Sequence, residues 1–284
     1  PVNDSISGGD GDDSLSGGLG NDTLDGGANS VGGLDIVDFR SATGPVSVNL
    51  ANGTASGQGT DTVLNFEGVF GSPQNDTIIG VNTSVALYMP GAGNDNVSGA
   101  GSFDIVDYFD APGPIVFTPT GPNAGTATGH GTDTYSGIDA LAGSNYGDSI
   151  TGSDAGETFR GRGGDDTLNG GGGVDRADYR FVNGSVTVNL QDGVASGDGN
   201  DVLTNFENAR GSELNNDTLI GNAGGNRLEG MGGADSLVGN GGDDTFIGSS
   251  GNDTLSGGSQ DLYDTADYTA ASGAVPVNLA AGTV

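Results

Sequence analysis

The chain has 284 residues with 58 Gly and 38 acidic residues, 33 of them Asp, against seven Arg and no Lys, which gives a formal net charge of −31. Because only 33% of the residues are hydrophobic, such a chain is expected to be disordered unless counter-ions neutralise it. The composition excludes disulfides and thiolate metal sites (no Cys), nucleic acid as a partner (no Lys and few Arg), and a membrane-spanning helix, since no apolar stretch approaches ~20 residues.

Residues 1–38 contain two consecutive nine-residue units, GGDGDDSLS and GGLGNDTLD, preceded by half a unit. Position 6 of each unit is Asp and position 8 is apolar, as in Leu15 and Leu24. The alternation predicts a short strand over positions 7 to 9 with position 8 pointing inward. The Gly residues of positions 1 to 6 predict a turn with unusual backbone angles. Two units then make one coil of 18 residues, and successive coils stack about 4.8 Å apart.

Residues 39–70 form a spacer that differs from the nonapeptide. Its V-x-V-x-L run (Val46, Val48, Leu50) predicts a strand, so we expect the spacer to continue the solenoid. Glu67 lies in an Asn-Phe-Glu motif that returns at Glu207 in a later copy, and for both we favour a role in closing a strand or turn over catalysis.

The rest of the chain repeats this alternation of a nonapeptide block and a spacer. Block 71–107 is degenerate, with Val85 in place of one acid, and spacer 108–142 holds the single histidine, His130, at a turn position where the other copies have Gln58 and Asp198. Blocks 143–178 and 212–267 carry four and five units, and spacers 179–211 and 268–284 follow them. We therefore expect one continuous solenoid over residues 1–284, cut from a longer array because the chain starts within a unit and ends within a spacer.

Stacked coils place the position-6 acids above one another, for example Asp4 above Asp22 and Asp148 above Asp166. Two carboxylates ~5 Å apart repel by roughly 3 kcal/mol, so the stack needs cations. Calcium fits because it takes six to eight oxygen ligands, carbonyls included, whereas magnesium requires a tighter octahedron. The predicted metal ligands are Asp4, Asp13, Asp22, Asp35, Asp76, Asp95, Asp104, Asp148, Glu157, Asp166, Asp175, Asp217, Asn226, Asp235, Asp244, Asp253 and Asp264.

The nonapeptide G-G-x-G-x-D-x-U-x resembles the repeat of the repeats-in-toxin (RTX) family. The resemblance implies an all-β fold, a right-handed parallel β-roll or β-solenoid, with several calcium ions held between the turns of successive coils. It also implies type I secretion, with the chain unfolded in the cytosol and folding outside the cell.

Two functional classes follow from these observations. The first is an extracellular structural or adhesive segment of a surface layer, matrix protein or large adhesin, with calcium as its ligand and polysaccharide or other copies of itself as possible partners. The second is a calcium-dependent folding and secretion module of a secreted lipase, protease or polysaccharide-modifying enzyme. The chain has no G-x-S-x-G elbow and no P-loop, so no catalytic residue is expected. The repeated spacers favour the first class.

Overall fold

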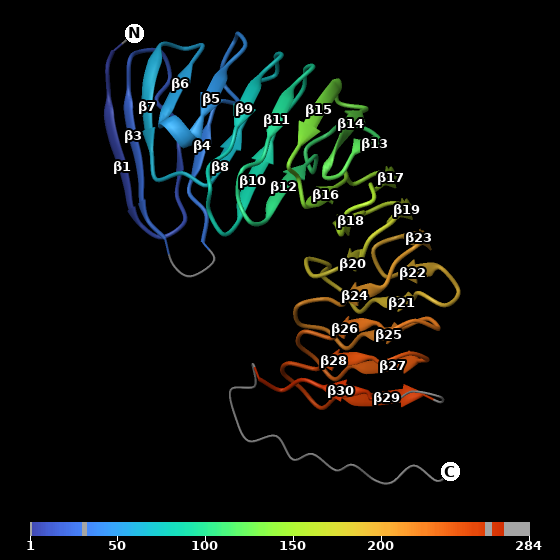
Figure 1. Cartoon of the computed structure of the whole chain (residues 1–284). Coiled ribbons are helices and arrows are strands. Elements are labelled where there is room, and N and C mark those ends of the chain that lie inside the picture. The colour runs from blue at the N-terminus through green and yellow to red at the C-terminus, as the bar shows by residue number, and fades with distance from the viewer. Residues whose placement is uncertain (1, 30–32, 259–262, 270–284) are drawn as a thin grey trace. The chain divides into compact units, whose positions relative to one another are not determined.

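The computed structural model describes residues 2–29, 33–258 and 263–269, and nearly all of their regular structure is short strand. The described residues contain one 3-10 turn, η1 (Leu50–Asn52), and no α-helix. Nothing helical in this part of the chain is therefore long and apolar enough to cross a membrane. The expected all-β class with parallel sheets is confirmed (Figure 1).

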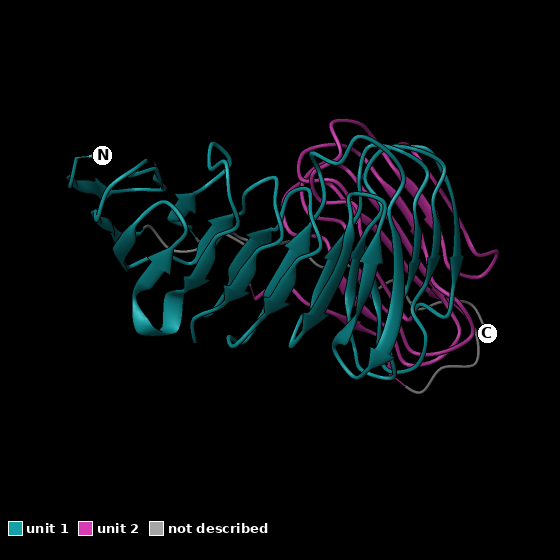
Figure 2. Cartoon of the chain, turned by 90° about the horizontal axis from the view of Figure 1, so that it is seen from above, with its two compact units in different colours: residues 1–177, 198–206 teal, residues 178–197, 207–284 magenta. Residues whose placement is uncertain are grey.

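The chain divides into two compact units, residues 1–177 with 198–206 and residues 178–197 with 207–284 (Figure 2). One continuous solenoid over residues 1–284 stays a prediction. Most of the predicted fourth spacer, residues 270–284, lies outside the described residues.

Unit 1 is built from two sheets. Its first sheet contains β1 (Ser5–Asp10), β3 (Thr23–Ala28), β5 (Ser47–Asn49), β6 (Thr54–Ser56), β7 (Thr60–Leu64), β9 (Thr77–Ile79), β11 (Asn96–Ser98), β13 (Val116–Gly121), β14 (Ala124–Thr128), β15 (Thr132–Ser136), β17 (Ser149–Thr151), β19 (Thr167–Asn169) and β23 (Asn200–Thr204). Its second sheet is parallel and contains β2 (Ser14–Leu15), β4 (Ile36–Asp38), β8 (Gly68–Phe70), β10 (Ala86–Met89), β12 (Asp104–Asp107), β16 (Ala140–Ala142), β18 (Thr158–Arg160) and β20 (Arg176–Asp178).

Strand pairing confirms the coil of 18 residues in the regular parts of the nonapeptide blocks, whereas longer coils separate Ser14 from Ile36, Thr77 from Asn96 and Thr245 from Thr265. Ser5 pairs with Thr23 in β1 and β3, and Ser149 pairs with Thr167 in β17 and β19. Successive coils thus place equivalent positions side by side, which is the condition for acids to stack along the turns.

The spacers continue the solenoid with an insertion that the V-x-V-x-L run did not reveal. In the first spacer β7 pairs parallel with β3, but β6 then runs antiparallel to β7, and β5 runs antiparallel to β6. β5 pairs parallel with β9 of the next block. The second spacer repeats this arrangement with β15, β14 and β13, and β13 pairs parallel with β17. Both of these spacers therefore insert one antiparallel strand into an otherwise parallel sheet.

Unit 2 has the same construction. Its first set of strands contains β21 (Thr187–Asn189), β22 (Val194–Ser196), β25 (Thr218–Ile220), β27 (Ser236–Asn240) and β29 (Thr254–Gly258). Its second set contains β24 (Asn208–Arg210), β26 (Arg227–Glu229), β28 (Thr245–Ile247) and β30 (Thr265–Ala266). β22 is antiparallel to β21, and the β21–β25–β27–β29 and β24–β26–β28–β30 series are parallel.

The core of each unit is a narrow stack of the apolar position-8 side chains. Ile150, Phe159 and Leu168 in unit 1 have no exposed surface, and neither have Leu219 and Leu228 in unit 2. At roughly 1.5–3 kcal/mol for each buried side chain, this stack is the main apolar stabilisation of a coil. The turns at its two edges carry the acids.

Candidate calcium sites along the turns

The position-6 acids form ladders along the turns, with one hydrogen bond per step. In the ladder next to the first sheet of unit 1, the backbone N–H of Asp4 donates to Oδ1 of Asp22 at 2.8 Å, and the N–H of Asp22 donates to Oδ1 of Asp61 at 3.0 Å. Each carboxylate thus accepts from the coil before it and lies beside the acid of that coil. The predicted stacking of Asp4 with Asp22 is observed.

The same three-membered ladder returns twice in unit 1. Asp76 donates to Asp95 at 2.7 Å and Asp95 donates to Asp133 at 2.8 Å. The third ladder runs through Asp148, Asp166 and Asp201, with distances of 2.7 and 3.1 Å. In each case the last acid belongs to a spacer.

Acids at the opposite turns form series of the same kind. There the N–H of Asp13 donates to Asp35 and that of Asp35 to Glu67. Glu157 donates to Asp175 in the same way, at 2.8 Å.

Unit 2 carries two further ladders. Asp217, Asp235 and Asp253 follow one another at 2.9 and 3.0 Å. On the other turns, Asn226 donates to Asp244 at 2.8 Å, and Asp244 donates to Asp264 at 3.0 Å. The predicted pairs of this block are therefore adjacent.

Several ladder carboxylates have one oxygen without any hydrogen-bond partner. This oxygen is Oδ2, and it is buried in Asp13, Asp22, Asp35, Asp95, Asp166 and Asp235. A buried carboxylate oxygen without a donor costs the desolvation free energy of a charged group. These six oxygens therefore require a positive partner or protonation of their carboxyl groups.

Burial and like charge together raise the pKa values of Asp35, Asp95, Asp166 and Asp235. Desolvation raises the pKa of Asp95 and of Asp166 to about 8, and the charges of their ladder neighbours add to the shift. The pKa of Asp235 is raised to about 7 for the same two reasons. A cation beside the orphaned oxygens would reverse this effect, because it favours the ionised carboxylate.

The turn backbone supplies further oxygens close to the acids. A Cβ added to Gly131 would lie 1.3 Å from the carbonyl oxygen of Gly93, and one added to Gly199 would lie 1.5 Å from that of Gly164. These glycines occupy position 4 of adjacent turns, so the turns stack at a distance that only glycine permits. Their carbonyl oxygens line the same edge as the carboxylates.

These donors fit calcium. Within the described residues no three acidic or histidine side chains converge on one point, so a metal would take one or two carboxylates and complete its shell with carbonyl oxygens. Calcium accepts such mixed oxygen shells. When bound, it would supply the positive charge that the orphaned Oδ2 atoms lack.

In a second group of predicted ligands, both polar atoms at the end of the side chain already have hydrogen-bond partners. In Asp104, Oδ1 accepts from the Tyr88 hydroxyl at 2.9 Å and Oδ2 from the N–H of Gly101 at 2.7 Å. The amide oxygen of Asn226 accepts from the N–H of Asn222. Asp76, Asp148, Glu157 and Asp217 are bonded to serines of their own turns.

The ladders also contain acids that the sequence interpretation missed. Asp61, Asp133 and Asp201 end the three ladders of unit 1, and Glu67 receives the N–H of Asp35. The signal was present, because SGQGTDTVL, TGHGTDTYS and SGDGNDVLT each keep Gly at positions 2 and 4, Asp at position 6 and an apolar residue at position 8. This nonapeptide unit was missed because each spacer was interpreted as one long segment.

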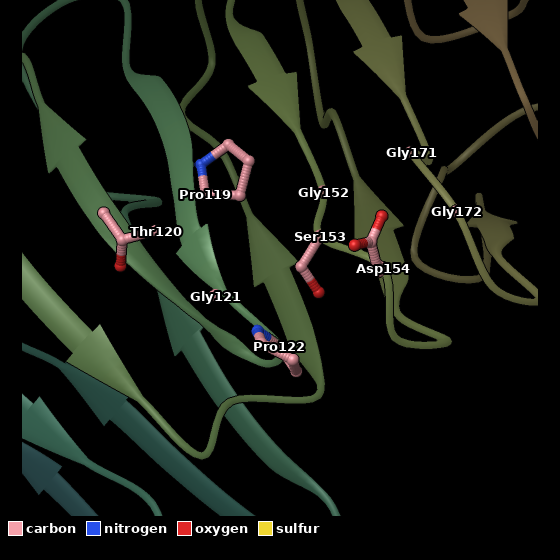
Figure 3. Close-up of a pocket in the computed structure, with 9 residues that line it drawn as sticks. All are labelled: Pro119, Thr120, Gly121, Pro122, Gly152, Ser153, Asp154, Gly171 and Gly172. Carbon is pink, nitrogen blue, oxygen red and sulfur yellow. The ribbon is translucent and has the colours of Figure 1, made fainter.

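The surroundings of the remaining candidate residues indicate a structural role. Phe39, Tyr108 and Tyr179 are buried, which leaves their rings no exposed face for stacking on a sugar. His130 is half-buried at position 3 of a turn. A shallow depression in unit 1 lies between residues 119–122 and the turns at 152–154 and 171–172, and most of its lining is Gly and Pro (Figure 3).

Comparison with known proteins agrees with this geometry. The family model described as the RTX calcium-binding nonapeptide repeat matches four segments, residues 2–30, 151–179, 214–246 and 229–261. No curated protein matches the chain. The matched segments contain Asp22, Asp166 and Asp235, three of the acids with an orphaned oxygen.

Proposed function

Because the chain is a calcium-binding repeat protein that carries RTX nonapeptides, we propose that it serves outside the cell as a structural or adhesive segment that folds on binding calcium. Such a segment would stiffen a surface layer, a matrix protein or a large adhesin. Its partners would be calcium and, through the outer faces of its coils, polysaccharide or further copies of itself.

The observation that carries this proposal is the set of buried, unpartnered Oδ2 atoms in the ladders. Folding without a cation would leave these oxygens desolvated beside like charges. A site at ten times its dissociation constant contributes about 1.4 kcal/mol, and six such sites contribute roughly 8 kcal/mol. That sum is comparable to the stability of a whole domain. Calcium would therefore decide whether the chain is folded.

The hydrogen bonds that the acids accept support a scaffold role. A hydrolase of the glycosidase type needs two carboxylates that face one bond. Here Glu67 accepts hydrogen bonds from Asn29 and Asp35, and Glu157 accepts them from Ser153. Both carboxylates therefore take part in the hydrogen bonding of the ladders.

The outer faces of the strands offer rows of small polar residues. Thr218, Ser236 and Thr254 pair in register on successive strands of unit 2. A regular row of hydroxyl groups suits contact with carbohydrate, which supports the adhesive side of the proposal. The second candidate, a folding and secretion module of a secreted enzyme, shares the calcium chemistry and needs no such surface.

Circular dichroism of the purified chain tests the coupling of folding to calcium. We expect a disordered spectrum in chelator, a β spectrum in millimolar calcium, and the chelator spectrum again in magnesium alone. An unchanged β spectrum in all three conditions would show that folding is independent of calcium. Retention of the calcium-loaded chain on immobilised cell-envelope polysaccharide, compared with the chain in chelator, then separates the adhesive role from the folding module, which predicts no retention.

A further inference from the structure

Two kinds of turn occur in the ladders, and they differ in backbone conformation. In the turns at 17–22, 90–95, 161–166 and 230–235, here called glycine turns, position 2 has a positive φ, as at Gly18 (79°) and Arg162 (69°). The turns at 71–76, 143–148, 152–157 and 211–217, here called serine turns, contain no residue with a positive φ. The second residue is serine in all four, and the turn at 211–217 is one residue longer than the others.

The serine of each serine turn binds the carboxylate of the same turn twice. The N–H of Ser144 donates to Oδ2 of Asp148 at 2.6 Å, and its hydroxyl donates to Oδ1 at 2.8 Å. The same hydroxyl accepts the N–H of Tyr146 at 3.1 Å, which closes the turn. Both oxygens of Asp148 are thereby satisfied, because Oδ1 also accepts the N–H of Ile115.

The other three serine turns repeat these bonds. Ser72, Ser153 and Ser212 donate their N–H groups to Asp76, Glu157 and Asp217 at 2.5, 2.7 and 2.6 Å. Their hydroxyl groups donate to the same carboxylates. By contrast, Oδ2 of Asp95, Asp166 and Asp235 in the glycine turns has no partner.

Serine at position 2 alone does not produce this arrangement. Ser249 occupies position 2 of the turn at 248–253, yet it has a φ of 67°, and the turn has Gly251 at position 4. Three of the serine turns have Gln74, Tyr146 and Ala155 at that position. Glycine at position 4 is not sufficient for the glycine-turn conformation, because the turn at 221–226 has Gly224 there and contains no residue with a positive φ.

Three of the serine turns lie where a spacer hairpin meets the next block. Oδ1 of Asp76, Asp148 and Asp217 accepts the N–H of Val46, Ile115 and Val186. These donors begin the strand region of a hairpin, so no Gly-rich turn lies on that side. The gap there lacks one of the two sets of turn carbonyls that a calcium between coils would need.

We propose that the serine turns are metal-free and that each holds its carboxylate by the serine N–H and hydroxyl where a glycine turn uses calcium. Calcium is then confined to gaps bordered on both sides by turns with a positive φ at position 2, such as the gap between Asp166 and Asp201, whose turn has Gly197 at 121°. This inference rests on the proposed calcium-dependent folding, and it removes Asp76, Asp148, Glu157 and Asp217 from the set of calcium ligands predicted from the sequence.

Asp148 and Asp166 provide a matched test, since they lie in adjacent coils of one ladder. The number of bound calcium ions is measured by equilibrium dialysis for the parent chain, Asp148→Asn and Asp166→Asn. We expect Asp166→Asn to lose about one ion and Asp148→Asn to keep the parental number. Loss of an ion from Asp148→Asn, or none from Asp166→Asn, overturns the assignment.

A second measurement covers the case in which a variant does not fold. Crystals of the parent chain in calcium, measured by anomalous scattering, should show ions at the orphaned Oδ2 atoms and none within bonding distance of Asp76, Asp148, Glu157 or Asp217. An ion at any serine turn refutes this inference while calcium-dependent folding stands. A parent chain that binds no calcium refutes both.

Discussion

The backbone N–H of Asp148 donates a 2.7 Å hydrogen bond to Oδ1 of Asp166, eighteen residues later in the chain. This single bond ties the backbone of one coil to the carboxylate of the next. It leaves Oδ2 of Asp166 buried without a partner, whereas both oxygens of Asp148 are bonded. Two chemically identical side chains therefore depend on different partners.

The pKa shifts predict how the calcium-free chain responds to pH. Asp95, Asp166 and Asp235 have folded pKa values of about 8, 8 and 7, above the ordinary value of 3.8. The folded chain therefore binds more protons than the unfolded chain between pH 4 and pH 8, and its stability falls as pH rises through this range. We expect more β signal in circular dichroism at pH 5 than at pH 8 in chelator.

The same pH comparison in the presence of calcium is the control for this experiment. Because the ion requires ionised carboxylates, the gain in melting temperature on adding calcium should be larger at pH 8 than at pH 5. A calcium-free β signal that rises with pH would contradict the predicted protonation of the ladder acids.

Substitution of a position-4 glycine should disrupt the stacking of turns. The Cβ of Gly131→Ala would lie 1.3 Å from the Gly93 carbonyl oxygen, so two backbone segments must separate. We expect a loss of about 2–4 kcal/mol in the free energy of unfolding in calcium, measured by urea denaturation. Gly113→Ala in the same spacer has open space around its Cβ and should change stability by less than about 0.5 kcal/mol. Equal effects of the two substitutions would argue against close stacking of these turns.

Truncation of a core side chain should destabilise unit 1 strongly. Phe159 has no exposed surface, and its ring lies 5.2 Å from that of Phe206 at an interplanar angle of 90°. Phe159→Ala should cost about 3–5 kcal/mol in the same denaturation assay. Leu19→Ala, at a side chain that is 62% exposed, serves as the control and should be nearly neutral. A small effect at Phe159 would mean that the position-8 stack contributes little.

Removal of the Tyr108 hydroxyl should cost less. This buried group donates to Oδ2 of Asp133 at 2.7 Å, so Tyr108→Phe leaves a buried carboxylate oxygen without its donor. We expect a loss of about 1–3 kcal/mol in calcium. The ring itself is tolerated, since Phe39 occupies the equivalent place in the first spacer. Tyr146→Phe, at a half-exposed ring, is the matched control and should melt at the parental temperature.

The nonapeptide pattern predicted the coil and much of the ladders because both depend on local spacing. Leu168 is buried and Asp166 stacks on Asp148 as the period of nine requires. The hairpins were missed because pairing of β6 with β5 and β7 is a non-local choice that alternation alone cannot specify. Asp61 and Asp133 were missed because their units are embedded in the spacers. The division between Asp148 and Asp166 depends on the φ angles of turn positions 2 and 4, which a search for acids ignores.

The antiparallel strands β6, β14 and β22 have a consequence for the length that such a chain can reach. Between Asp61 and Asp76 the sheet passes through β6 and β5, three strand spacings or about 14 Å. That separation exceeds the screening length of about 8–10 Å in physiological salt. Along this edge of the sheet the mutual repulsion of the acids is thus contained within groups of three, and each added copy of the repeat brings the same electrostatic cost there as the one before it.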